Sequence, residues 1–382
     1  MKIGIEAQRI FRKKKHGMDM VALELIRNLQ QIDKENEYVI FVKPDEDNTI
    51  IKETANFKIV ELQGGAYPMW EQVALPKAAA KHGCQVLHCT SNTAPLFCKI
   101  PLVITLHDII YMESSAINII RSSGSNYQKF GNIYRRLIVP KLVRKSKKII
   151  TVSNFEKDCI GKFFGMQNDK RLTTVYNGVS EYFQPVTDAG VLKAVKEKYN
   201  LPDNYVFFLG NTHPKKNTKG ALAAFSQFLK QTGSDMKLVM IDYDKTELEK
   251  LLQEIGDAEL ISKIVLTGYI VNHDLPAIYA QSQLFLYPSL RESFGIPLIE
   301  AMACGVPVIT SNTSSMPEIA GDSAILIDPY KPEESTAAMI KVFNDNNLRT
   351  AMIKDGIVQA AKFSWKAMAQ DVLKIYTETG NQ

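Results

Sequence analysis

Short apolar runs alternate with longer stretches of helical character along almost the whole chain. In the first half the runs include YVIFV, LVITL and KIITV, and in the second half they include YVFFL, LFLYP and VPVIT. Strands that alternate with helices pair into parallel sheets whose faces the helices cover. The pattern therefore predicts an α/β fold.

The alternation stops at 184–204, where hydrophobic residues are scarce, and then restarts. A chain of 382 residues is too long for one ordinary core and suits two domains. We therefore expect two α/β domains, at 1–183 and 190–364, joined by a linker near 181–190. The last segment, 365–382, reads as an amphipathic helix.

The composition excludes several classes of protein. Hydrophobic residues make up 45% of the chain and charged residues 23%, as in soluble globular proteins. No apolar run reaches the roughly 18 residues that a membrane-spanning helix needs. The N-terminus, MKIGIEAQRIFRKKK, has no signal-peptide core, and the five cysteines show no paired metal-ligand spacing. These features predict a cytoplasmic protein with reduced thiols.

The net charge of +5 is concentrated in clusters at 12–15 and 135–148. Such clusters suit an anionic lipid surface, a phosphate-bearing acceptor or nucleic acid. No nucleic-acid-binding motif accompanies them, so nucleic acid is not an expected partner. The segment 127–148 mixes apolar and basic residues, and we expect Pro140 to divide it into two short helices. An ordinary solvated helix face and peripheral docking to an anionic membrane both remain open for this segment.

The stretch 284–310 combines two strands, a turn and a helix. LFLY reads as a strand buried on both faces, which Pro288 ends. Pro297 suits the first position of a helix, where its missing N–H costs nothing. Gly305 then ends the helix, and VPVIT reads as a second buried strand. The order strand, turn, helix, strand places the turn at the carboxyl edge of a parallel sheet.

Two carboxylates lie in this stretch, Glu292 in the turn and Glu300 about one turn into the helix. The free amides at the helix start attract a diphosphate, and Gly295 allows it to approach closely. A carboxylate accepts two hydrogen bonds side by side, as the vicinal diol of a sugar offers them. Two solvated glutamates would have the same spacing, but ligands of open α/β folds bind at this edge of the sheet. The stretch therefore predicts a nucleotide-sugar site.

The sequence ESFGIPLIEAMACGVPVITSNTSSMPEIAGDSAILIDP resembles the signature of the family 4 retaining glycosyltransferases, which have the GT-B fold. The resemblance implies two Rossmann-like domains whose parallel sheets face each other across a cleft. It also implies that the C-terminal helix packs back on the N-terminal, acceptor-binding domain. The activity that it implies is transfer of a hexose from a nucleotide sugar with retention of configuration, without a metal or other cofactor.

The run RESFGIPLIEA and the loop HPKKN are similar to those of bacterial mannosyltransferases and other hexosyltransferases of surface-polysaccharide assembly. This likeness implies an acceptor hydroxyl on a glycan or a lipid-linked glycan. In the resembled family Glu300 would hold the ribose diol and Glu292 the hydroxyls of the donor sugar. Ser293 and Phe294 would belong to the same donor-binding loop.

A second candidate site follows the run YVFFL, after which Gly210 ends the strand. The polar loop after it carries Lys215 and Lys216, and a lysine ammonium is a point charge suited to a diphosphate. The resemblance implies that Lys216 neutralises the leaving nucleotide, with Gly210 and Asn211 beside the donor. Asn211 stands where relatives often carry arginine, and Lys215 is the candidate substitute.

In the first half, LVITLHDI puts His107 and Asp108 just past a buried strand. A lone histidine at a strand end is often structural, but the resemblance implies that His107 faces the donor sugar and hydrogen-bonds a hydroxyl. Gly17, in KHGMDM, is the remaining glycine of a loop that is glycine-rich in relatives and approaches the donor phosphates. We therefore expect Glu292, His107 and Lys216 to act in catalysis and Gly17 to bind the donor.

Two other classes of protein stay open. A sugar-nucleotide epimerase of double-Rossmann build would need acid and base groups around the anomeric carbon, and the motifs contain no clear pair. A non-catalytic sugar-binding protein of two domains would normally carry an export signal.

Overall fold

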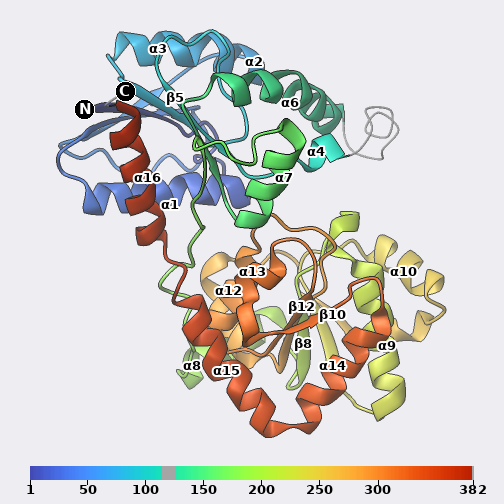
Figure 1. Ribbon diagram of the computed structural model, residues 1–382. Helices are drawn as coiled ribbons and strands as arrows, with labels where there is room; N and C mark the ends of the chain where they lie inside the picture. Colours follow the sequence, from blue (N-terminus) through green and yellow to red (C-terminus); the bar gives the residue numbers. More distant parts are fainter. Residues whose placement is uncertain (114–125, 381–382) are drawn as a thin grey trace. The chain divides into compact units, whose positions relative to one another are not determined.

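The computed structural model describes residues 1–113 and 126–380, and the chain divides into two compact units (Figure 1). The first unit comprises Met1–Gly178 and Trp365–Gln382, and the second comprises Val179–Ser364. Each unit contains one sheet, and all strand pairs described within the two sheets are parallel. The predicted α/β fold class is therefore confirmed.

The sheet of the first unit has seven strands in the order β3-β2-β1-β4-β5-β6-β7. The apolar runs of the sequence form its first six strands, whereas the short run LTT that forms β7 was not predicted. The strands are β1 Lys2–Glu6, β2 Glu37–Val42, β3 Phe57–Glu61, β4 Val86–Cys89, β5 Leu102–Leu106, β6 Lys148–Thr151 and β7 Leu172–Thr174.

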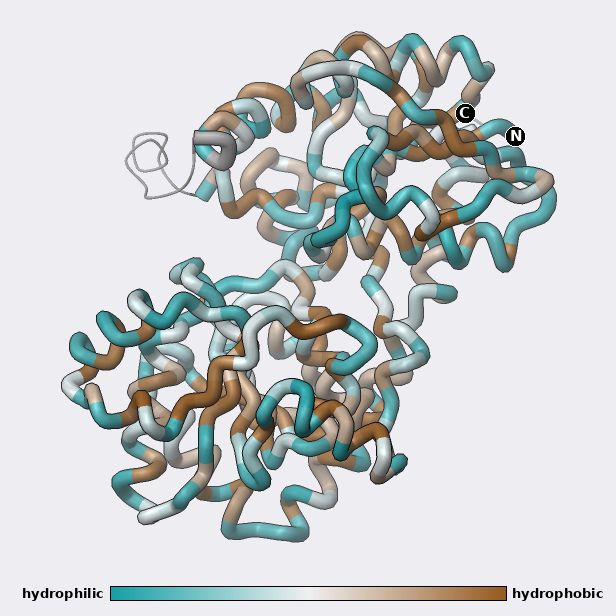
Figure 2. Tube along the Cα trace, turned by 180° about the vertical axis from the view of Figure 1, so that it is seen from behind, coloured by the Kyte–Doolittle hydropathy of each residue, from teal (hydrophilic) through white to brown (hydrophobic). Residues whose placement is uncertain are grey.

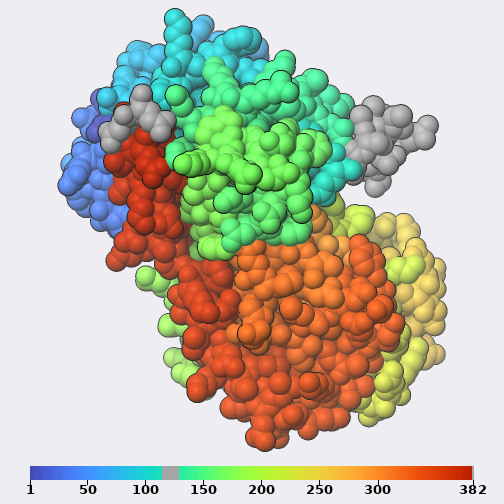
Figure 3. Space-filling model, in the orientation of Figure 1, coloured from blue at the N-terminus to red at the C-terminus, as the bar shows by residue number. Residues whose placement is uncertain are grey.

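Helices cover this sheet, and α16 packs along α1 within the unit. Figure 3 shows α16, in red, lying on the surface of the first unit. A π-helical turn, η1, joins α2 to α3. The helices are α1 Gly17–Ile32, α2 Tyr67–Met69, η1 Trp70–Ala74, α3 Leu75–Lys81, α4 Ile110–Glu113, α6 Asn126–Lys145, α7 Asn154–Phe164 and α16 Trp365–Gly380.

The sheet of the second unit has six strands in the order β10-β9-β8-β11-β12-β13. These are β8 Tyr205–Phe208, β9 Lys237–Met240, β10 Ile264–Leu266, β11 Leu284–Tyr287, β12 Val308–Ser311 and β13 Ile325–Ile327. Its helical segments are α8 Ala189–Tyr199, η2 Pro214–Lys216, α9 Thr218–Thr232, α10 Lys245–Glu254, η3 Ala258–Lys263, η4 Asn272–Asp274, α11 Leu275–Gln281, α12 Ile296–Ala303, α13 Met316–Ala320, η5 Gly321–Ser323, α14 Pro332–Asn344 and α15 Asn346–Ala360.

Hydrophobic side chains form a separate core in each unit, and Figure 2 shows brown, hydrophobic segments inside each unit with teal segments around them. Phe41 and Trp70 are fully buried in the first core, and Phe208 and Phe225 are fully buried in the second. Burial of one such side chain contributes about 1.5–3 kcal/mol. These cores fix the strands, and the strands fix the loops at their carboxyl ends.

The strand order reverses between β1 and β4 in the first sheet and between β8 and β11 in the second. The loops that follow two such strands turn in opposite directions. Ligands of open parallel sheets bind at this topological switch point, beyond the carboxyl ends of the strands. The loops after β8 and β11 are those that carry the lysines and Glu292.

The predicted break at Pro140 is wrong, because α6 is one continuous helix from Asn126 to Lys145. A proline inside a helix removes one backbone hydrogen bond and crowds the preceding turn. Val139, Leu142 and Val143 are buried in the core on the inner side of α6. Their packing on both sides of Pro140 offsets the lost bond, so the helix continues.

Candidate functional site

Lys216 and Glu292 meet at the switch point of the second sheet. Lys216 follows β8 and Glu292 follows β11, 76 residues later. The Nζ of Lys216 lies 2.7 Å from Oε1 of Glu292, and the two side chains are only 11% and 9% exposed. Because the pair is buried, its attraction is screened much less than that of a surface pair.

The loop after β8 folds in a way that presents Lys216. A Cβ atom on Gly210 would lie 2.2 Å from the ring of Phe208, so only glycine fits there. Asn211 is exposed, and its side chain accepts a hydrogen bond from the backbone N–H of His213. Asn217, at a φ of +54°, starts α9 and donates to the carbonyl oxygens that follow β11 and β13. These hydrogen bonds fix the turn that carries Lys215 and Lys216.

Lys215 and Lys216 are placed differently. Lys216 is buried, whereas Lys215 is partly exposed and its carbonyl oxygen accepts a hydrogen bond from Leu290 N–H at 2.7 Å. That bond joins the loop after β8 to the loop after β11. Both ammonium groups act on the charge of Glu292.

Three serines at and just after the end of β12 hold the loop of Glu292. The backbone N–H of Glu292 donates to Oγ of Ser314 at 3.1 Å, and Oγ of Ser315 donates to the carbonyl of Glu292 at 3.0 Å. Oγ of Ser311 donates to the carbonyl of Ser289 at 2.5 Å. Both backbone groups of Glu292 are thus fixed, which positions its carboxylate.

The two predicted glutamates differ in ionisation. Burial alone would raise the pKa of Glu292, but the ammonium groups of Lys216 and Lys215 outweigh it and hold that pKa below its ordinary value. Burial raises the pKa of Glu300 to about 8, and a hydrogen bond with Tyr279 opposes the rise only in part. At neutral pH Glu292 is a carboxylate and Glu300 is mostly a carboxylic acid, which can donate a hydrogen bond.

The turn between the glutamates depends on Gly295, which caps α12 at a φ of +93°. A Cβ atom there would lie 2.3 Å from Cε of Met316. The side chain of Phe294 is buried against the ring of Phe363. Only the backbone of Phe294 is therefore available to contact a ligand. Ser293 is partly exposed beside it.

In the first unit His107 is buried just past β5. Its backbone N–H donates to Oδ1 of Asn92 at 2.6 Å, and its ring Nε2 lies 2.9 Å from the carbonyl oxygen of Thr90. Burial lowers the pKa of His107, against the opposing effect of that carbonyl. A carbonyl only accepts, so Nε2 carries the proton and Nδ1 is left as an acceptor. A neutral acceptor suits a hydroxyl group.

Gly17 is the first residue of α1 and is exposed. A Cβ atom there would meet nothing within 4 Å, so packing does not require glycine. Asp19, in the same turn, accepts from His16 N–H at 3.0 Å and pairs with Arg9, whose Nε lies 2.9 Å from Oδ1. Gly17 and His107 belong to the first unit, and the other predicted site residues belong to the second.

Sequence reasoning missed several buried polar residues at the first switch point. Glu6, at the end of β1, accepts from Gln8 N–H and Thr90 N–H, and burial raises its pKa. Glu71, in the π-helical turn, accepts from four side chains, which are Tyr67, Gln72, Thr93 and Tyr134. A charged residue directly after an apolar run was the available signal for Glu6.

Tyr287 was missed in the second unit, although its hydroxyl lies 2.8 Å from Nζ of Lys216. It ends the run LFLY and reads as one more apolar strand residue, so the sequence carried no signal for it.

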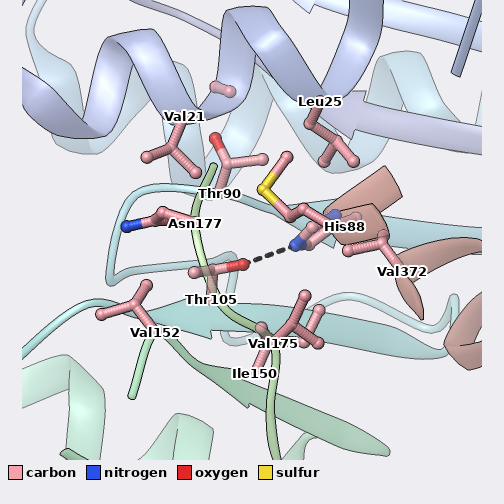
Figure 4. Close-up of a pocket in the computed structure, with 12 residues that line it drawn as sticks. Val21, Leu25, His88, Thr90, Thr105, Ile150, Val152, Val175, Asn177 and Val372 are labelled. Atoms are coloured by element: carbon pink, nitrogen blue, oxygen red, sulfur yellow. Dashed lines mark hydrogen bonds between the residues drawn. The ribbon is translucent and has the colours of Figure 1, made fainter. Parts of the chain in front are cut away.

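A small cavity in the first unit is lined in part by Thr90, the residue that contacts both Glu6 and His107 (Figure 4). His88, Thr105 and Asn177 contribute to its lining, and Nε2 of His88 lies 2.8 Å from Oγ1 of Thr105. Its volume of about 20 Å³ suits one water molecule rather than a sugar nucleotide. Across the described residues no three His, Cys, Asp or Glu side chains are grouped to hold a metal ion.

Comparisons with known proteins agree with this geometry. The family described as "Glycosyltransferase Family 4" matches residues 16–181, and the family described as "Glycosyl transferases group 1" matches residues 193–359. The HepE protein of Anabaena in complex with UDP-glucose has the same fold over 99% of this chain and 100% of its own, with a TM-score of 0.75 at 16% identity. The predicted GT-B fold is thereby confirmed.

Two curated relatives are enzymes of O-antigen assembly by name. O-antigen chain mannosyltransferase B of Escherichia coli is 33% identical over 60% of this chain and 60% of its own length. O-antigen chain mannosyltransferase RfbU of Salmonella typhimurium is 30% identical over 68% of this chain and 65% of its own length. The chain thus spans less than two thirds of the length of these relatives.

Proposed function

The chain belongs to the glycosyltransferases of group 1 and family 4, and we propose that it transfers a hexose from a nucleotide sugar to a hydroxyl of a glycan or lipid-linked acceptor. The observation that carries the proposal is the buried contact of Lys216 with Glu292 at the switch point of the second sheet. A cation and an anion held side by side match a donor in which a diphosphate adjoins a polyol.

The diphosphate binds to Lys216, with Lys215 near the same anion and the first amides of α12 facing it. Gly295 and the backbone of Ser293 and Phe294 border it. Glu292, a carboxylate at neutral pH, accepts hydrogen bonds from the hydroxyls of the donor sugar. Glu300 binds the ribose. The other donor-binding residues are Gly210, Asn211 and Gly17.

Departure of the nucleoside diphosphate is the difficult step, so positive charge near the leaving oxygen is the main catalytic contribution of the protein. Lys216 supplies this charge. His107, with Nδ1 as acceptor, orients a hydroxyl near the reacting carbon. We propose retention of configuration, by attack on the face from which the diphosphate leaves, with the proton of the acceptor hydroxyl passing to an oxygen of the leaving diphosphate, and a reaction without a metal ion.

We propose mannose as the transferred sugar and a growing surface polysaccharide as the acceptor, in the cytoplasm. The names of the two O-antigen mannosyltransferases support this choice.

The test incubates the protein with GDP-mannose, UDP-glucose or UDP-N-acetylglucosamine, with and without a mannose-terminated oligosaccharide, and analyses the products. The expected result is release of GDP that depends on the acceptor, with a lengthened oligosaccharide. An isomerised donor would indicate an epimerase. Donor binding without any product would indicate a sugar-binding protein. Glu292→Ala is measured beside it and should show much slower transfer.

We further propose that α6 mediates peripheral contact with an anionic membrane. Its exposed apolar residues are Phe130, Ile133 and Leu137, which are 56%, 40% and 63% exposed. Lys141 follows Leu137 by four residues, and Arg144 and Lys145 follow Lys141 by three and four, so all six lie on one face of the continuous helix. We call this face the α6 stripe.

The α6 stripe suits an anionic lipid surface because the helix contains lysine and arginine but no aspartate or glutamate. Each basic residue near such a surface contributes about 1 kcal/mol. Within 1–113 and 126–380, no helix has the length and hydrophobicity to cross a bilayer. Contact through the stripe would bring the enzyme to a lipid-linked acceptor.

A further inference from the structure

Tyr287 is the last residue of β11 and is only 1% exposed. Its ring stacks on Phe285 at a centroid distance of 5.4 Å, and its carbonyl oxygen accepts a hydrogen bond from Oγ1 of Thr310 at 2.9 Å. Backbone and ring are therefore both fixed by the sheet. A side chain held in this way keeps its hydroxyl group at one point in space.

The hydroxyl group of Tyr287 lies in contact with the Lys216 ammonium group. Nζ of Lys216 lies 2.8 Å from the hydroxyl oxygen of Tyr287 and 2.7 Å from Oε1 of Glu292. An ammonium has three N–H donors in tetrahedral directions. Two acceptors, one fixed at the end of β11 and one in the loop that follows it, determine the directions of two donors, and the direction of the third follows from them.

The hydroxyl of Tyr287 serves as a neutral acceptor. Burial and the nearby Glu292 carboxylate raise the pKa of Tyr287 well above its ordinary value, so the phenol keeps its proton. A second carboxylate in its place would neutralise the lysine further. A neutral oxygen holds the ammonium in position and leaves its positive charge available to a ligand.

We propose that Tyr287 is a positioning residue for the transfer reaction, which holds Lys216 so that its third N–H is directed at the leaving diphosphate. The inference rests on the proposed function. Without the hydroxyl, the flexible lysine stem would let the ammonium move toward Glu292 alone. Charge that must reorient during the reaction stabilises a transition state less than charge that is already in place.

The test compares Tyr287→Phe with Tyr205→Phe. Phenylalanine keeps the ring of Tyr287 and removes only the oxygen. Tyr205 is an equally buried tyrosine of the same sheet, and its hydroxyl donates to the carbonyl of Ile278 at 2.6 Å. Tyr205→Phe loses the bond to Ile278, whereas Tyr287→Phe loses the bond to Lys216 and the contacts of its hydroxyl with Glu292 and Ser289, so its Tm should fall at least as much.

With GDP-mannose as donor, we expect kcat of Tyr287→Phe to fall about tenfold to a hundredfold, the range for a hydrogen bond to a charged group. KM should change little, as for an interaction realised in the transition state. Tyr205→Phe should keep kcat. Equal kcat values for the two variants would overturn the inference, and absence of transfer by the unmodified protein would instead overturn the proposed function.

A binding measurement, which does not depend on enzyme activity, tests whether Tyr287 acts through Lys216. Calorimetry with GDP, whose terminal phosphate carries the negative charge that the leaving group acquires in the transition state, should show weaker binding to Tyr287→Phe than to the unmodified protein. In a Lys216→Ala background the same substitution should have no further effect, because the group on which it acts is gone. An equal additional loss in that background would show that Tyr287 does not act through Lys216.

Discussion

The Lys216 ammonium and the Glu292 carboxylate form a buried ion pair, 2.7 Å apart, across the point where the second sheet reverses its strand order. Burial of both charges costs free energy that their attraction must offset. The proposed donor gives each charge a further partner: its diphosphate would contact Lys216, and its sugar hydroxyls would contact Glu292. The pair therefore links the stability of the second unit to the binding of its substrate.

Removal of one partner of this pair should destabilise the second unit. Lys216→Met leaves the Glu292 carboxylate buried without its counter-ion, and we expect a loss of about 3 kcal/mol at neutral pH. Lys219→Met removes a pair with Glu254 in which both side chains are more than half exposed, and should cost less than about 1 kcal/mol. Urea unfolding of the two variants measures the difference. Equal losses would argue against the electrostatic importance of the buried pair.

The raised pKa of Glu300 should appear in the pH dependence of stability. Its pKa is about 8 in the folded protein and near 4.5 in the unfolded chain. Between these values the folded state binds more protons than the unfolded state, so the free energy of unfolding falls as pH rises, by up to about 1.4 kcal/mol per pH unit.

Glu300→Gln removes this titration, because glutamine carries no charge at any pH. Relative to the unmodified protein, the variant should therefore gain stability as the pH is raised from 5 to 8. The measurement is denaturant unfolding at a series of pH values. A difference between the two proteins that stays constant over this range would contradict the raised pKa.

Substitution by alanine should destabilise the protein at Gly295 but not at Gly17. Gly295→Ala places a Cβ 2.3 Å from Met316 at a φ of +93°, and we expect a loss of at least about 1 kcal/mol in stability together with weaker donor binding. Gly17→Ala meets no atom within 4 Å and should leave stability unchanged. If Gly17 approaches the donor as predicted, its variant should show a raised KM for the donor only. An unchanged KM would leave Gly17 as a simple surface residue.

The α6 stripe should bind vesicles that contain anionic phospholipid. Replacement of Phe130 and Leu137 by serine removes most of its exposed apolar area and should lower binding at least about tenfold, since each such side chain contributes about 1.5–3 kcal/mol when fully buried. Phe163→Ser, on α7, removes an aromatic residue of similar exposure, 51%, and is the control. Sedimentation with vesicles at two salt concentrations measures the effect. Vesicle binding that changes neither with salt concentration nor with the double substitution would show that the α6 stripe is not the membrane-binding surface.

The parts of the fold that could be predicted from the sequence were those that depend on local pattern. LFLY and the VIT of VPVIT formed strands because short apolar runs bounded by proline and glycine are buried in parallel sheets. Glu292 and Glu300 were found because both lie next to such boundaries. In contrast, α6 continues through Pro140, since packing of its inner face outweighs a local preference.

The parts that could not be predicted depend on contacts between distant residues. The approach of Lys216 to Glu292 and Tyr287 spans more than 70 residues and follows from strand order, which no local pattern specifies. Glu71 gains its distant partners, Thr93 and Tyr134, from a loop and from α6. Tyr287 was hidden because a tyrosine at the end of an apolar run has the same pattern as a core residue.

Transfer from GDP-mannose by Glu292→Ala, compared with the unmodified protein, tests the central claim most directly. If Glu292 holds the donor sugar beside the leaving diphosphate, kcat/KM should fall at least about a hundredfold, equivalent to roughly 3 kcal/mol of transition-state stabilisation. A decrease of about fivefold or less, near 1 kcal/mol, would contradict the role assigned to this carboxylate.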